Sequence, residues 1–102
     1  MLELLEPWES PIDDAQRSHF EDELRREISQ QHVLSGKAVR ALGHRVDMDD
    51  VVFLVEGGPQ VATFHLTYSY ERDPSLPSTR FYVSIEEFGR MQMNPDHEEY
   101  NL

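Results

Sequence analysis

One segment constrains the fold of this chain more than any other: five consecutive apolar residues, 51–55, followed almost at once by Gly57-Gly58-Pro59. Valines stand on both sides of Phe53, so the segment predicts a strand that is covered on both faces or lies centrally in a sheet. The two glycines and the proline predict a turn. Residues 60–70 then alternate between two faces, which predicts a second strand returning beside the first.

Residues 13–31 carry the clearest helical pattern. Phe20, Leu24 and Ile28 recur every four residues and form a narrow apolar stripe, so we expect one face of this helix to dock on the sheet. Asp13 and Asp14 suit the first turn, where carboxylates meet free backbone N–H groups.

The remaining segments complete an α+β pattern. Four segments are expected to be strands: 37–47, 50–56, 60–70 and 80–83. Ser84 and Glu87 match a capping box, which predicts a short helix that ends at Asn94-Pro95. Successive strands without alternating helices favour α+β over α/β. We therefore expect an N-terminal helix packed on a three- to four-stranded antiparallel meander, with a short C-terminal helix.

Domain organisation is simple at a length of 102 residues. Residues 1–12 contain two prolines and are expected to form an extended lead-in, with Trp8 as its anchor. Residues 13–93 are expected to form a single domain, and residues 94–102 an acidic tail that frays.

The charge of the chain is strongly acidic and uneven. There are 20 Asp and Glu against 9 Lys and Arg, a net charge of −11, and both ends are acidic while the middle is nearly neutral. Nucleic acids and anionic membrane surfaces are disfavoured as ligands because no basic footprint is visible. A basic protein partner would be attracted, although net charge also serves solubility alone. The chain has no cysteine, which favours a reduced, cytoplasmic compartment.

Two histidines are candidates for chemistry. His65 lies in the middle of a predicted strand, on a face that it shares with threonines. His44 lies near the end of the first predicted strand, just before the acidic loop that leads to the second strand. Together with Asp49 they would form a His/carboxylate cluster for a metal-dependent hydrolase. The alternative is that His65 is structural, shielded and hydrogen-bonded to a neighbour, since no known catalytic motif surrounds it. We expect no cofactor.

The segment HRVDMDD offers three carboxylates within four residues, and hard cations prefer such oxygen ligands. It fails the EF-hand pattern, because it lacks glycine at the sixth position and glutamate at the twelfth. The alternative is a polar connection in which Asp49 or Asp50 caps a turn.

Aromatic and arginine side chains suggest an interaction surface. Tyrosine, tryptophan and arginine are the residue types that dominate binding at protein interfaces. The candidates here are Trp8, Tyr68, Tyr70, Arg72, Arg80 and Tyr82. The alternative is that they complete the edge of the core.

The stretches GHRVDMDDVVFLVEGG, ATFHLTYS and MNPDHEEY resemble a family of small, uncharacterised bacterial proteins, a domain of unknown function. The resemblance covers the C-terminal half. Its matching residues are His44, Asp49, Asp50, Val51, Phe53, His65, Leu66, Thr67 and Asp96. It implies no activity, cofactor or partner.

The sequence as a whole favours a small, acidic binding protein without catalysis of its own. Its specific form is an inhibitor- or immunity-like partner of a basic protein. Two alternatives stay open: the metal-dependent hydrolase, and a homo-oligomeric structural protein, such as a homodimer, that pairs exposed sheet edges.

Overall fold

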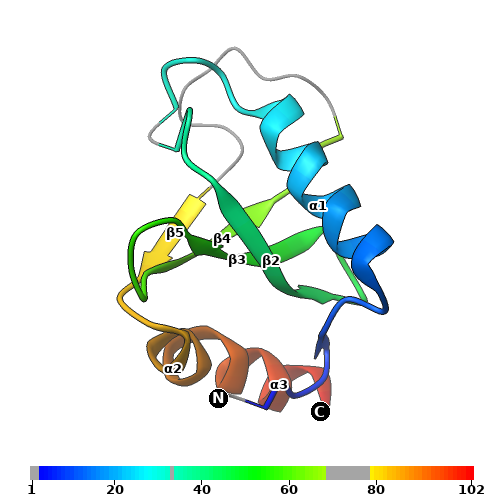
Figure 1. The fold of residues 1–102 in the computed structure, drawn as a ribbon. Coiled ribbons are helices and arrows are strands. Elements are labelled where there is room, and N and C mark those ends of the chain that lie inside the picture. The colour runs from blue at the N-terminus through cyan, green and yellow to red at the C-terminus, as the bar shows by residue number, and fades with distance from the viewer. Residues whose placement is uncertain (1–2, 33, 69–78) are drawn as a thin grey trace.

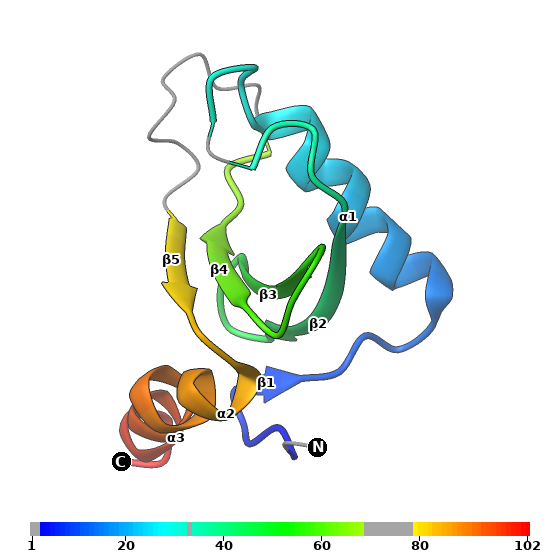
Figure 2. The ribbon, with the colours of Figure 1, turned by 60° about the vertical axis from the view of Figure 1, so that its left-hand side comes forward.

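The computed structural model describes residues 3–32, 34–68 and 79–102. A five-stranded antiparallel sheet lies between two helical layers, with α1 on one face and the C-terminal helices on the other (Figures 1 and 2). The strands are β1 (Trp8–Glu9), β2 (Val39–Arg45), β3 (Asp50–Val55), β4 (Val61–His65) and β5 (Thr79–Tyr82), and they follow one another across the sheet in chain order. The α+β class is confirmed, with one strand more than the sequence predicted.

The additional strand, β1, comes from the segment that was expected to be only an extended lead-in. Trp8 pairs with Arg45 and Glu9 with His44 on β2. The close approach explains the glycine at the β2 bulge, because a Cβ at Gly43 would meet a Leu4 side-chain carbon at 2.6 Å and the Glu9 carbonyl oxygen at 3.2 Å. The N-terminal segment is therefore an integral edge of the sheet.

Helix α1 (Asp14–Glu27) begins where the sequence predicts, since the Asp13 side chain accepts a hydrogen bond from the Gln16 N–H. It ends four residues earlier than expected, where Ile28 turns to an extended conformation. Its inner face, Phe20 and Leu24 with the half-buried Ile28, belongs to one apolar cluster with residues of β2, β3 and β4 that include Phe53, Phe64 and Leu66. The predicted docking face is confirmed.

The C-terminal segment forms one continuous helical layer: α2 (Ile85–Phe88), the π-helical turn η1 (Gly89–Met93) and α3 (Asn94–Tyr100). The expected stop at Asn94-Pro95 and the expected frayed tail are wrong. Pro95 lies in the first turn of α3, directly after the π-helical turn η1, and the helical path continues through it. The predicted start is confirmed, because Ser84 accepts from the Glu87 N–H at 3.2 Å.

A second apolar cluster lies under this layer and contains Trp8, Val52, Val61, Tyr82, Phe88 and Met93. The ring of Phe88 stands edge-on to Trp8 at 5.0 Å and to Tyr82 at 5.8 Å. Val61 and Thr63, on the face of β4 that also carries His65, are consequently buried. Among the described residues, none of the helices has the length and apolar character that crossing a membrane requires.

Candidate functional site

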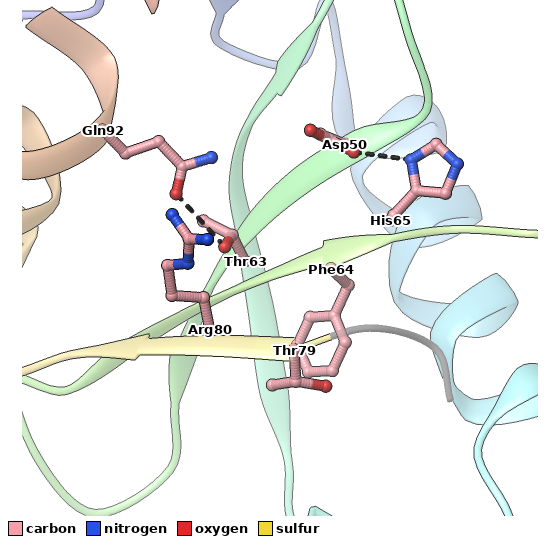
Figure 3. A pocket seen from close by; sticks show the side chains of 7 residues that line it. All are labelled: Asp50, Thr63, Phe64, His65, Thr79, Arg80 and Gln92. Carbon is pink, nitrogen blue, oxygen red and sulfur yellow. Dashed lines mark hydrogen bonds and ion pairs between the residues drawn. The ribbon is translucent and has the colours of Figure 1, made fainter. Parts of the chain in front are cut away.

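A polar pocket opens where the C-terminal layer leaves the sheet uncovered, across β3, β4 and β5 (Figure 3). Its volume is about 220 Å³. The residues that line it are Asp50, Thr63, Phe64, His65, Thr79, Arg80 and Gln92. Titratable, hydroxyl and amide groups from three strands and from η1 therefore meet in one place.

Strand register brings His65 and Asp50 together. The two residues are directly opposed in the β3–β4 pair and point to the same face. His65 Nδ1 donates to Asp50 Oδ1 at 2.7 Å. The imidazole is 56% exposed and the carboxylate 18% exposed. The expected hydrogen-bonded neighbour of His65 is present, but the expected shielding is wrong, because more than half of the imidazole is exposed.

The other side of the pocket is built by Arg80, Thr63 and Gln92. Arg80 is opposed to Thr63 in the β4–β5 pair. Gln92 reaches down from η1, and its Oε1 accepts from the Tyr82 hydroxyl at 2.6 Å and from Thr63 Oγ1 at 3.4 Å. These two bonds fix the amide, so its N–H₂ group is the end left to serve as a donor in the pocket.

The histidine cluster expected for a hydrolase does not form. His44 opposes Val51, and its ring packs on Phe20 at 5.0 Å, on the α1 face of the sheet. His65 lies on the opposite face. Asp49 lies in the loop between β2 and β3, where its carbonyl oxygen accepts from the Leu66 N–H at 2.9 Å.

The carboxylates of HRVDMDD are engaged separately. Asp47 accepts two hydrogen bonds from Arg45, at 2.9 and 2.8 Å, and this guanidinium lowers the pKa of the Asp47 carboxyl. Asp50 turns to His65. No group of three or more His, Asp or Glu that could hold a metal ion occurs within residues 3–32, 34–68 and 79–102.

The candidate interaction residues do not share one surface. Trp8 and Tyr82 are buried, 1% and 7% exposed, so their assignment to an interface is wrong: both complete the core under the C-terminal layer. Tyr68 is exposed and stacks on His19 of α1 at 6.0 Å, while Arg80 belongs to the pocket on the other face. Tyr70 and Arg72 lie outside the described residues.

The two acidic chain ends lie side by side, which the sequence did not indicate (Figures 1 and 2). Trp8 Nε1 donates to Asp96 Oδ2 at 2.9 Å, and His97 Nδ1 lies 2.6 Å from the carbonyl oxygen of Glu6. Residues 1–12 and 94–102 contain six acidic residues and no Lys or Arg. Five of these acids are exposed: Glu3, Glu6, Glu9, Glu98 and Glu99. We call these five residues the acidic end surface.

Sequence reasoning also missed a buried pair of carboxyl groups on α1. Glu27 is completely buried and accepts from the Thr67 N–H at 2.6 Å, the Thr67 hydroxyl at 2.9 Å and the Tyr68 N–H at 2.7 Å. Glu23, one turn earlier, is 5% exposed, and its Oε2 has no hydrogen-bond partner. Burial, and then the neighbouring Glu23 carboxyl, raise the pKa of Glu27, and the three donors only partly oppose this. The sequence signal that could have indicated this pair is the four-residue spacing of Glu23 and Glu27 beside the apolar stripe of α1.

Comparison of the chain with protein families, with curated proteins and with solved structures finds no match.

Proposed function

We propose that the protein binds a basic protein partner through the acidic end surface, in the manner of an inhibitor or immunity protein. The observation that carries the proposal is the joining of two acidic chain ends, without Lys or Arg in either, into one surface. Complementary charge speeds encounter and selects partners, and its effect is largest where like charges gather.

The nearby cation does not neutralise this surface. Arg45 lies 3.5 Å from Asp96 Oδ2, but its side chain is only 13% exposed and already binds Asp47. Glu98 and Glu99 lie in the last turn of α3 and are exposed, so they are available to a partner. The binding interpretation therefore rests on the location of charge and not on net charge alone.

The test reverses charge at this surface and at a matched position. In the Glu98→Lys/Glu99→Lys variant, cations replace anions near a helix C-terminus, where they suit the helix dipole, so folding is expected to be unaffected. The control is Asp22→Lys/Glu56→Lys, which has the same net charge and changes exposed residues on α1 and after β3. Wild type and both variants are immobilised, and the proteins captured from a lysate of the source cells are identified.

We expect wild type and the control to retain the same basic protein, and the Glu98→Lys/Glu99→Lys variant to lose it. An equal loss of capture by both variants would show that net charge and not this surface attracts the protein. Capture of no basic protein by wild type would contradict the proposal itself.

The alternatives receive less support. The metal-dependent hydrolase needs His44, His65 and Asp49 in one site, and the sheet separates the two histidines. A homodimer through a sheet edge would use β1 or β5, the outer strands of the described sheet. Size-exclusion chromatography of the purified chain at several concentrations distinguishes this case, since it requires no second protein.

A further inference from the structure

The polar pocket contains two opposite charges that do not meet. Arg80 and Asp50 line the same cavity, on strands that are separated by β4. No ion pair joins them, and within the described parts of the chain no carboxylate lies within ion-pair distance of Arg80. Figure 3 shows the guanidinium beside Thr63 and the carboxylate on the far side of this residue. A molecule seated between them could satisfy both.

We propose that this pocket binds a small zwitterion, a molecule of amino-acid size whose carboxylate pairs with Arg80 and whose ammonium group pairs with Asp50. This site goes beyond the proposed partner binding, because it lies at the polar pocket and not at the acidic end surface. It needs no metal and no chemical step.

Donors for a carboxylate are present in the pocket, and one of them, the Gln92 amide, is held in position. A guanidinium presents two parallel N–H groups to a carboxylate, which is the strongest geometry available to an arginine. The Gln92 amide is fixed through its Oε1, so its N–H₂ group is available as a further donor beside Arg80. Gln92 is also carried by η1, and π-helical turns are rare and frequently occur at functional sites.

The acceptor for an ammonium group is equally defined. Asp50 uses Oδ1 for the hydrogen bond from His65, and its Oδ2 accepts no hydrogen bond from the described residues. The bond to His65 holds the carboxylate in place while leaving one oxygen for a ligand. A lone anion would meet Asp50 as a like charge, and a lone cation would meet Arg80, so the pocket favours a molecule that carries both charges.

The size of the cavity limits the ligand. Pockets for drug-sized molecules have volumes of roughly 300–1,000 Å³. This cavity holds about 220 Å³, so it suits a molecule of a few heavy atoms and excludes a nucleotide.

The test is a titration of the ¹⁵N-labelled full chain, followed by backbone and side-chain amide shifts. The probes are glycine, β-alanine and γ-aminobutyrate, which place carboxylate and ammonium at increasing separations. Acetate and ethylammonium serve as probes with a single charge. We expect saturable shifts at Asp50, Thr63, His65, Arg80 and Gln92 with at least one zwitterion, and affinity at least about tenfold weaker for either single-charge probe.

Two variants assign the charges. Arg80→Gln and Asp50→Asn each remove one charge from the pocket and are each expected to weaken binding of the best zwitterion at least about tenfold. Arg90→Gln is the control, because Arg90 is exposed and does not line the cavity. The spectra themselves report whether each variant is folded.

Three outcomes would overturn the proposal. No saturable shift with any of the three zwitterions would show that the pocket does not bind this class. Equal affinity for acetate, with Asp50→Asn without effect, would make it a plain anion site. Equal weakening by Arg90→Gln would show that the shifts report general charge and not this pocket.

Discussion

At the scale of single residues, Trp8 and Asp96 join the two ends of the chain. The indole is buried, and its only polar group donates to the Asp96 carboxylate at 2.9 Å. The Arg45 guanidinium lies 3.5 Å from the same oxygen. The Asp96 carboxylate thus accepts from a buried N–H group and lies beside a largely buried cation, and both would otherwise be poorly solvated. It therefore contributes more to the stability of the fold than an exposed carboxylate would.

Removing this carboxylate should destabilise the protein. Asp96→Ala leaves the indole N–H without its acceptor, and we expect a loss of about 1–3 kcal/mol in the free energy of unfolding. Asp96→Asn keeps an acceptor and should cost less. Urea denaturation followed by the fluorescence of Trp8, the one tryptophan of the chain, measures both. Equal stability of Asp96→Ala and wild type would show that the bond contributes nothing.

At the scale of secondary structure, α1 is held by apolar packing along one stripe. Leu24 is 1% exposed within the cluster that joins α1 to the sheet. Leu24→Ala should therefore lower the free energy of unfolding by about 2–5 kcal/mol. Ile12→Ala, at a position 83% exposed, is the control and should change it little. Similar denaturation midpoints for the two variants would contradict the docking of α1.

The same helix also fixes the end of β4 through Glu27. Tyr68 adopts a positive φ of 59°, which a bulky residue rarely tolerates, and its N–H donates to Glu27. The raised pKa of Glu27 means that the folded protein holds this proton more tightly than the unfolded chain. Between the ordinary pKa of 4.5 and the higher folded value, the free energy of unfolding from this group falls as pH rises.

We expect Glu27→Gln to remove this pH dependence. The stability difference between wild type and the variant should be largest in favour of wild type below pH 4.5 and should shrink as pH rises above it. Other carboxylates, such as Asp47, have pKa values that are lowered by arginine and change stability in the opposite sense, but they are common to both proteins. Urea denaturation from pH 4 to pH 7 makes the comparison. A pH-independent difference would contradict the assignment.

At the scale of the whole molecule, a sheet between two helical layers brings distant segments together. The pocket joins residues of β3, β4, β5 and η1. The acidic end surface joins glutamates from the N-terminal segment with Glu98 and Glu99 near the C-terminus. Neither arrangement is encoded in a local pattern. Both depend on strand order and on the path of the C-terminal helices over the face opposite α1.

This dependence explains what the sequence could and could not predict. The hairpin around Gly57-Gly58-Pro59, the α1 stripe and the Ser84 cap are local signals, and all three are confirmed. The two-residue strand β1 has no periodicity and exists only through pairing with β2. The sequence predicts a helix end at Pro95 because it shows that a proline is present but not where in a helical turn the proline lies.

The candidate site was predicted less well than the fold, for the same physical reason. His65 was identified from its place in a strand, but its partner is Asp50 and not Asp49, and a shift of one residue reverses the face of a strand side chain. Gln92 and Arg80 join the pocket only through tertiary packing, and no spacing along the chain indicates them.

The most direct test of the central claim is the dissociation constant of the captured basic protein for wild type and for Glu98→Lys/Glu99→Lys, measured from about 50 to 500 mM salt. If the acidic end surface carries the binding, wild-type affinity should fall steeply with salt, because screening shortens the reach of exposed charges. The variant should bind weakly throughout. A wild-type affinity that is independent of salt and equal to that of the variant would contradict the account.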